Sequence, residues 1–204
     1  MADIVLAMPF LLKNEDGPNG RYFYQSPHEA LTGGDPGGET IHGIARAFWP
    51  TWTGWKIVDS FKTISGFPGI FYYDATLNAL VASFYKENFW DKIQGDAVNA
   101  QVLITQVFDS AVNQGEGAAT KLLQDAINSV ENCVAVDGDF GPQTLANLNR
   151  LCFGKGVSDS IMARFLELRI AKYQARAAQL TAEGSAEAND LPDWLSRCVV
   201  PVLA

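Results

Sequence analysis

The 204-residue chain has few cysteines and histidines, which limits the metal and disulfide chemistry that it can support. Cys133, Cys152 and Cys198 form no Cys-x-x-Cys pair, and His28 and His42 are the two histidines. A structural zinc site needs several such residues at close spacing, and a sparse, odd set of cysteines does not make a disulfide framework. We therefore expect no metal, no cofactor, and three buried or half-buried thiols in a reducing compartment.

Positive charge is also scarce, with 15 Lys and Arg against 23 Asp and Glu and a net charge of −8. Nucleic-acid binding normally needs a basic face, so this balance argues against a nucleic-acid partner. The sequence also lacks an apolar run long enough to be inserted into a membrane. Residues 1–3 are acidic where a secretory signal would be basic, so we expect synthesis in the bacterial cytoplasm without a signal peptide and an unknown export route.

Hydrophobic residues make up 48% of the sequence, which suits one globular domain or two small ones with a shared core. Apolar residues recur at helical spacing, and Asp74 is the expected N-cap of the clearest helix. The expected helices span about 3–15, 74–92, 96–114, 117–130 and 158–183, and two more are expected to start at Pro142 and Pro192. The fold class is therefore mainly α.

An elaborate segment rich in glycine and proline occupies about 16–39. Residues 21–24 could form a short strand within it, between turns. From about residue 39 onward, helical patterning is expected to return. The sequence thus predicts a helical fold that is interrupted by a Gly-rich loop or a small β-hairpin near the N-terminus.

Glu15 ends the first expected helix, where two effects favour the protonated form of its carboxyl group. The negative end of a helix dipole disfavours a carboxylate, and partial burial acts in the same direction. A glutamic acid that stays protonated near neutral pH can act as a general acid, although an exposed glutamate is the alternative. Asp35 and Thr40, across the Gly-rich loop, could hold and activate water as in inverting glycoside hydrolysis.

The segments Leu12–Gly17 and Asp35–Ile44 resemble the N-terminal motifs of glycosyl hydrolase family 108, which are lysozyme-like N-acetylmuramidases of bacteria and phages. In that family a Glu-Gly-Gly sequence follows a short helix, and Asp-x-Gly-Gly-x-Thr-x-x-Gly-Ile comes later. The resemblance implies a lysozyme-like helical fold with Glu15 as the catalytic acid. It also implies that Asp35 and Thr40 act beside this acid.

The chain departs from the family pattern in two places. Asp16 replaces the first glycine after Glu15, and the stretch between Glu15 and Asp35 is longer than usual. The longer stretch leaves Glu29 and Glu39 as alternatives for the second carboxylate, although both are expected on the surface.

Aromatic residues near these motifs are candidates for substrate binding, because sugar rings stack on flat apolar faces. Tyr22 and Tyr24 lie in the longer stretch, and Trp49 and Trp52 follow the Gly-rich motif. A place in the core is an equal alternative for the tryptophans. Asn113, near the end of an expected helix, could line the cleft or cap that helix.

The second half resembles the companion region of the same family, which is usually called a predicted peptidoglycan-binding domain. The matching segments include 89–91, 108–115, 123–124, 136–145 and 194–197. The expected division is a lysozyme-like catalytic region over 1–92 and a helical peptidoglycan-binding region over 93–204, packed into one compact unit.

The resemblance implies a peptidoglycan hydrolase that cleaves the β-1,4 bond between N-acetylmuramic acid and N-acetylglucosamine. The partner would be the glycan strands of the cell wall, in the periplasm or outside, and a monomer is the expected state. A phage or prophage endolysin is one origin of such a bacteriolytic enzyme. Two alternatives stay open: a lytic transglycosylase, and a non-catalytic protein that binds peptidoglycan or assists secretion.

Overall fold

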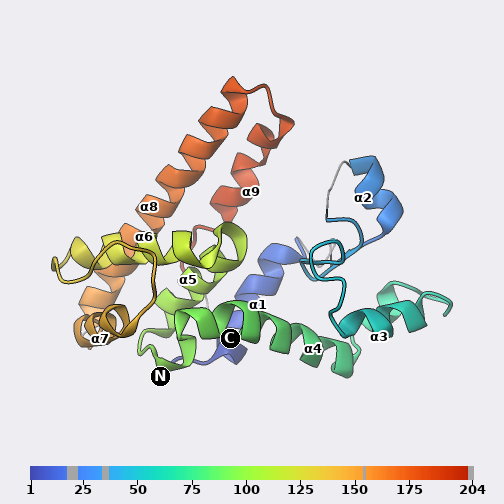
Figure 1. Cartoon of the computed structure of the whole chain (residues 1–204), viewed down its shortest axis with the longest axis horizontal. Coiled ribbons are helices and arrows are strands. Elements are labelled where there is room, and N and C mark those ends of the chain that lie inside the picture. The colour runs from blue at the N-terminus through green and yellow to red at the C-terminus, as the bar shows by residue number, and fades with distance from the viewer. Residues whose placement is uncertain (18–22, 34–36, 154, 202–204) are drawn as a thin grey trace. The chain divides into compact units, whose positions relative to one another are not determined.

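The computed structural model describes residues 1–17, 23–33, 37–153 and 155–201. The chain forms two compact units, one of Leu11–Asn88 and one of Met1–Phe10 together with Phe89–Ala204. Helix α1, Ile4–Glu15, contributes to both units. The expected mainly α fold is confirmed, because helices dominate the described residues and a small antiparallel sheet accompanies them (Figure 1).

The unit of Leu11–Asn88 combines the sheet with short helices. After α1 its described elements are β1 (Tyr24–Gln25), α2 (Pro27–Gly33), β2 (Thr40–Ile41), β3 (Ile44–Ala45), α3 (Gly54–Phe61), a short 3-10 helix (Gly69–Phe71) and α4 (Ala75–Tyr85). The strands are antiparallel in the order β1-β2-β3, and Ile41 pairs with both Tyr24 and Ile44. The core is apolar and includes the fully buried Leu11, Ile41, Ile44, Val58, Phe71 and Leu77.

The turn between β2 and β3 consists of His42 and Gly43, whose φ values are 47° and 78°. Positive φ at both central residues is what a type I′ hairpin turn requires. The expected return of helical patterning at about residue 39 is therefore wrong for this segment, whereas the small β-hairpin near the N-terminus is confirmed.

Helix α2 was not expected in the glycine- and proline-rich segment, yet its start carries a clear signal. The Ser26 hydroxyl accepts a hydrogen bond from the Glu29 backbone N–H at 3.2 Å, and the Glu29 carboxylate accepts one from the Ser26 N–H at 2.8 Å. This reciprocal pair is a capping box, and Pro27 occupies the first helical position. The composition of the segment hid the Ser-Pro-His-Glu motif.

The second unit is built from longer helices. They are α5 (Gln101–Gln114), α6 (Glu116–Asn128), α7 (Pro142–Leu151), α8 (Lys155–Ala182) and α9 (Leu191–Ser196), with short helical turns at Lys86–Trp90, Asp91–Ile93, Gly95–Ala97 and Ala186–Asp190. Helix α6 packs against α5 and α8. After α8 the chain turns back, so that α9 packs beside α8 (Figure 1).

The helix boundaries follow the expected capping residues in most places. Asp74 is the N-cap of α4, since its Oδ1 accepts a hydrogen bond from the Leu77 N–H at 2.7 Å. Helix α5 ends at Gln114, as expected, with Gly115 as its C-cap. Its expected start near residue 96 is wrong, because Gly95–Ala97 forms a separate 3-10 turn in which Gly95 lies under the Trp90 indole.

A buried carboxylate with two arginines holds the core of the second unit together. Asp109 and Arg169 are fully buried, with 2.6 Å between Asp109 Oδ2 and Arg169 Nη2. Arg197 Nη2 lies 2.8 Å from the other carboxylate oxygen of Asp109. Pairing both oxygens offsets the large cost of removing these charges from water. The cluster thereby joins α5, α8 and the residue that follows α9.

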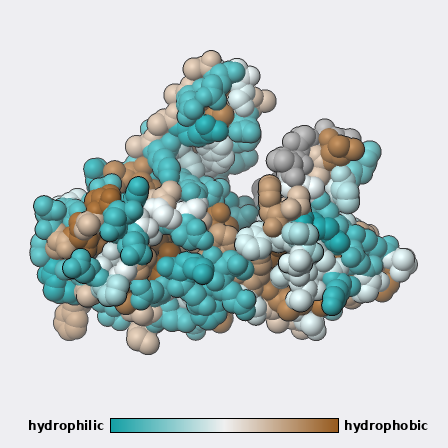
Figure 2. Space-filling model, in the orientation of Figure 1, coloured by the Kyte–Doolittle hydropathy of each residue, from teal (hydrophilic) through white to brown (hydrophobic). Residues whose placement is uncertain are grey.

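Cys133, Cys152 and Cys198 are free and half-buried, as expected. Among the described residues, no helix combines the length and the apolar character needed to cross a membrane. On the face drawn in Figure 2, hydrophobic residues form small separate groups within a largely hydrophilic surface.

Candidate functional site

The carboxyl group of Glu15, the last residue of α1, lies directly against Gly43 in the β2–β3 turn. A Cβ atom built on Gly43 would stand 2.5 Å from Glu15 Oε2 and 2.7 Å from the hydroxyl oxygen of Tyr85. Any side chain here would collide with both groups, and the φ of 78° favours glycine as well. Gly43 therefore provides the space in which the Glu15 carboxyl group is seated.

Tyr85 is a site residue that the sequence did not reveal. It lies near the end of α4 with 1% of its surface exposed, and its hydroxyl donates a hydrogen bond to the His42 carbonyl oxygen at 2.6 Å. A buried tyrosine hydroxyl needs a polar partner. The sequence does place Tyr85 on the apolar face of an expected helix, and this position could have indicated that its side chain is buried. Tyr85 fixes the turn against which Glu15 packs.

Asp16, the departure from the family motif, forms a buried pair with the other turn residue. Asp16 and His42 are 4% and 3% exposed, and His42 Nδ1 lies 2.9 Å from each Asp16 carboxylate oxygen. Within the described part of the chain, the buried Nε2 of His42 has no hydrogen-bond partner. This contact ties the residue after Glu15 to the residue before Gly43, so it fixes the helix end and the turn together.

Thr40 lies in β2 of the same hairpin. It is half-buried, and its hydroxyl donates a hydrogen bond to the Gly38 carbonyl oxygen at 3.1 Å. Tyr24, an expected substrate contact, lies in β1 and is half-buried, whereas Asp35 and Tyr22 lie outside the residues that the structure describes.

Glu39 was expected on the surface, but it is buried with 5% of its area exposed. Its Oε1 accepts a hydrogen bond from the Tyr24 hydroxyl at 2.7 Å and lies 2.8 Å from Lys62 Nζ. Its Oε2 lies 2.8 Å from Arg46 Nε. Burial, and then the hydrogen bond to the Glu39 carboxylate, raise the pKa of Tyr24. Sequence reasoning missed this cluster because its members are far apart in the chain.

Asp59 in α3 completes the charge cluster on its exposed side. Hydrogen bonds from Arg46 and Lys62 lower the pKa of the Asp59 carboxyl group to about 2. The Arg46 guanidinium also lies over the Trp55 ring, 4.3 Å from its centre. The cluster thus links α3 to the residues on either side of the hairpin.

The three tryptophans that follow the hairpin differ in burial. Trp55 is buried in the core, and its Nε1 donates to the Trp49 carbonyl oxygen at 2.8 Å. Trp49 is 38% exposed and meets Phe84 edge-on, with 4.9 Å between ring centres. Trp52 is half-buried and meets Trp55 edge-on at 5.3 Å. Ring surface therefore remains accessible on Trp49 and Trp52.

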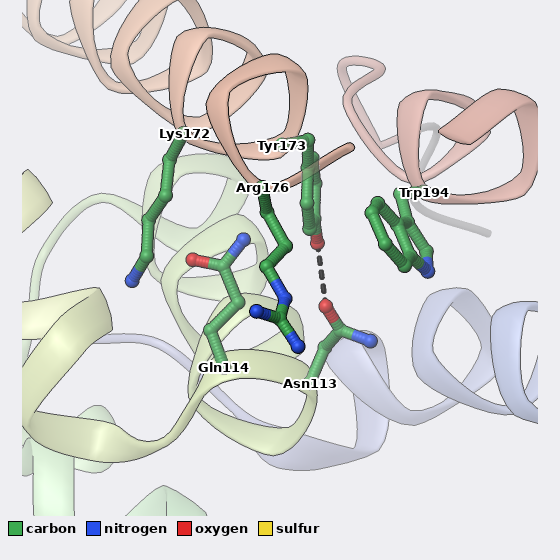
Figure 3. Close-up of a pocket in the computed structure, with 6 residues that line it drawn as sticks. All are labelled: Asn113, Gln114, Lys172, Tyr173, Arg176 and Trp194. Carbon is green, nitrogen blue, oxygen red and sulfur yellow. Dashed lines mark hydrogen bonds between the residues drawn. The ribbon is translucent and has the colours of Figure 1, made fainter. Parts of the chain in front are cut away.

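Asn113, the remaining expected site residue, belongs to the second unit and is exposed. Its Oδ1 accepts a hydrogen bond from the Tyr173 hydroxyl at 2.6 Å. It lines a pocket of about 300 Å³ in that unit together with Gln114, Lys172, Tyr173, Arg176 and Trp194 (Figure 3).

Comparison with known proteins gives a family for part of the chain. Residues 30–115 match the model of the family described as Glycosyl hydrolase 108. The chain carries a glycosyl hydrolase 108 region. Glu15 precedes this glycosyl hydrolase 108 region. Four of the expected site residues that the structure describes lie within it: Thr40, Trp49, Trp52 and Asn113. No curated protein matches the chain.

A likeness to a solved structure extends well beyond the glycosyl hydrolase 108 region. The structure titled "Structure of Brucella abortus SagA" covers 94% of this chain and 91% of that chain, with 25% sequence identity and a TM-score of 0.54. The fold is therefore shared along nearly the whole length of both chains.

Proposed function

We propose that this chain is a peptidoglycan hydrolase, an N-acetylmuramidase that cleaves the β-1,4 bond between N-acetylmuramic acid and N-acetylglucosamine. The observation that carries the proposal is the seat of the Glu15 carboxyl group against Gly43, with the Tyr85 hydroxyl beside it. The glycosyl hydrolase 108 match supports cleavage of a glycosidic bond. The resemblance of the motifs around Glu15 supports peptidoglycan as the substrate.

In this mechanism Glu15 donates a proton to the glycosidic oxygen as the bond from that oxygen to the anomeric carbon breaks. Positive charge develops on the sugar ring, and a water molecule attacks the anomeric carbon while its proton passes to a second carboxylate. We assign that base to Asp35, with the Thr40 hydroxyl orienting the water. Inversion of configuration is expected if the two carboxyl groups are about 6.5–9.5 Å apart.

Three other carboxylates in this region already have hydrogen-bond or ion-pair partners, which supports the assignment of Asp35 as the base. Asp16 is paired with His42, and Glu29 caps α2. Glu39 is buried against two cations and a tyrosine hydroxyl. A carboxylate that is already held by such partners is a poor base for water, because its lone pairs are occupied and its charge is stabilised.

Trp49 and Trp52 have accessible ring surface, which supports their assignment as sugar contacts. We also assign peptidoglycan binding to the helical region 93–204, and we place the site of action on the cell wall outside the cytoplasm.

The decisive experiment is release of reducing ends from purified peptidoglycan, with the products identified by mass spectrometry. Wild-type protein should release fragments that end in reducing muramic acid, and Glu15→Gln should lose nearly all of this activity. Glu183→Gln changes an exposed residue that directly follows α8; it is the matched control and should retain the activity. Activity in Glu15→Gln would remove Glu15 from the mechanism.

Two other results would replace this proposal by its alternatives. Anhydro-muramoyl products would identify a lytic transglycosylase, in which the 6-hydroxyl of the sugar attacks in place of water. Wall binding without release of reducing ends would identify a binding protein.

A further inference from the structure

The pocket at the end of α5 is a second place in the molecule with the properties of a ligand site. Its volume of about 300 Å³ is within the range of small-molecule sites. Lys172, Tyr173 and Arg176 point from α8 toward Asn113 and Gln114 at the end of α5, and Trp194 of α9 closes one side (Figure 3). All the lining residues belong to the second unit.

The wall of this pocket is fixed by the buried charge cluster behind it. Arg169, which is paired with Asp109, donates a hydrogen bond from Nη2 to the Tyr173 hydroxyl at 2.9 Å. That hydroxyl donates in turn to Asn113 Oδ1. Because its oxygen is held in this way, the Asn113 side chain is left with its NH2 group as the part available to a ligand. The pocket is thus preorganised by groups that are not exposed themselves.

Gln114 supplies an amide that lacks partners inside the protein. Both Nε2 and Oε1 of its side chain are buried and have no hydrogen-bond partner within the described residues. In Figure 3 this amide lies between Lys172 and Arg176. A buried amide without partners is costly unless a ligand or water satisfies it. The side-chain N–H of this amide can donate to the C=O of a peptide group, and its oxygen can accept from the N–H of one.

Positive charge gathers in this pocket although the chain as a whole is acidic. Within the described residues Lys172 has no ion-pair partner, and burial lowers the pKa of its ammonium group. The nearest carboxylate oxygen to Arg176 is Oε2 of Glu187, at the long distance of 4.0 Å, and both side chains are substantially exposed. The C-terminal end of α5 carries the negative end of its helix dipole, which opposes anion binding in the pocket. The full positive charges of Lys172 and Arg176 outweigh this partial negative charge.

We propose that this pocket binds an acidic peptide, with Lys172 and Arg176 on its carboxylates and Gln114 on a peptide group. The Trp194 and Tyr173 rings, whose centres are 5.8 Å apart, provide the apolar surface for an aliphatic side chain. Lys172 and Arg176 are one helical turn apart, so they suit two separate carboxylates better than one compact anion. The inference rests on the proposed function only for the source of the peptide, which would be the acidic stem peptide of peptidoglycan.

The test is isothermal titration of the full chain with the stem peptide L-alanyl-γ-D-glutamyl-meso-diaminopimelate. Its carboxylate-amidated form and an N-acetylglucosamine oligomer without peptide serve as comparison ligands. The acidic peptide should bind, and each of Lys172→Met and Arg176→Gln should weaken binding roughly tenfold, as expected for one lost charge-assisted hydrogen bond. Arg164→Gln, which removes an exposed charge elsewhere on α8, should leave binding unchanged.

Gln114→Leu separates a ligand role from a structural one. Replacing a buried amide that lacks partners should leave the melting temperature unchanged or raise it, yet peptide affinity should fall. Three results would overturn the proposal: equal affinity for the acidic and amidated peptides, equal weakening of binding by Arg164→Gln, or no binding of the acidic peptide.

The same measurements separate this inference from the hydrolase proposal. A chain that releases reducing ends but does not bind the peptide would overturn this inference alone. A chain that binds the peptide but releases no reducing ends would overturn the hydrolase proposal and support this pocket.

Discussion

His42 Nδ1 lies 2.9 Å from both carboxylate oxygens of Asp16, so the residue after the proposed acid is locked to the turn that faces that acid. The family pattern has glycine at the position of Asp16. Here a buried carboxylate replaces it, and an imidazole accompanies it on the hairpin. The pair makes the orientation of Glu15 depend on a contact between α1 and the β2–β3 turn.

Removal of one member of this pair should destabilise the fold. His42→Ala leaves the Asp16 carboxylate buried without its partner, and we expect a loss of about 3 kcal/mol in the free energy of unfolding. Asp16→Gly combined with His42→Ala should recover part of that loss, because neither group is then left unpaired. Urea unfolding of the wild type, both single variants and the double variant measures the coupling. Strictly additive losses would show that the contact contributes nothing.

Gly43→Ala should reduce activity far more than stability. The new Cβ would lie 2.5 Å from Glu15 Oε2, so the carboxyl group must move, and a displacement of about 1 Å can cost roughly 100-fold in rate. The positive φ adds a strain of about 1 kcal/mol. Gly184→Ala carries the same kind of strain at a φ of 72° with open space around it, so it is the control for activity. Equal activity of the two variants would show that the seat of Glu15 is unimportant.

Glu39→Gln should destabilise the unit of Leu11–Asn88 by about 1–2 kcal/mol. The change neutralises a buried carboxylate that holds Arg46 and Lys62, but these side chains are 31% and 35% exposed and keep Asp59 as a partner, so the cost is below that of breaking a fully buried ion pair. Glu131→Gln, which breaks the exposed pair with Arg150, should cost less than about 1 kcal/mol. Chemical denaturation compares the two. A stable Glu39→Gln variant without glycosidase activity would instead point to a catalytic role for Glu39.

Stability at low pH should depend on Asp59. Its pKa is lowered in the folded state from 3.8 to about 2, so its contribution is complete above 3.8 and is lost as the pH falls toward 2. Because Asp59 is exposed, the contribution should be at most about 1 kcal/mol. Asp59→Asn should therefore be slightly less stable than wild type at neutral pH, and the two unfolding curves should converge near pH 2. A constant difference throughout this range would contradict the assignment.

Helices in both units could be predicted from sequence because periodicity and capping act locally. Asp74 and Gly115 mark helix boundaries through their own side-chain or backbone chemistry, and the structure agrees with both. A small hairpin was predicted, but the position of the β2–β3 turn was not, because the turn uses His42 at positive φ, which is uncommon for a residue with a side chain. That conformation is stabilised by Asp16, which lies far from the turn in sequence.

The site was predictable only where a motif names a residue. Glu15 was singled out by resemblance, whereas Tyr85 and the burial of Glu39 depend on contacts between distant segments. The pocket with Gln114 and Arg176 depends on α8 returning to the end of α5, which no local pattern encodes. Sequence patterns therefore identified the proposed acid but not the groups that hold it.

Helix α1 has a consequence for the order in which the chain can fold. It is synthesised before the other described helices and strands, yet just before it the Ala2 N–H donates to the Val98 carbonyl oxygen and the Asp3 N–H donates to the Gln101 side chain. During translation the beginning of α1 must wait until these partners leave the ribosome, by which time every element of the Leu11–Asn88 unit has been made. A fragment that stops at residue 92 would deprive the helix that carries Glu15 of its anchor. The proposed enzyme is therefore a discontinuous assembly, and its activity should not survive division into separately expressed halves.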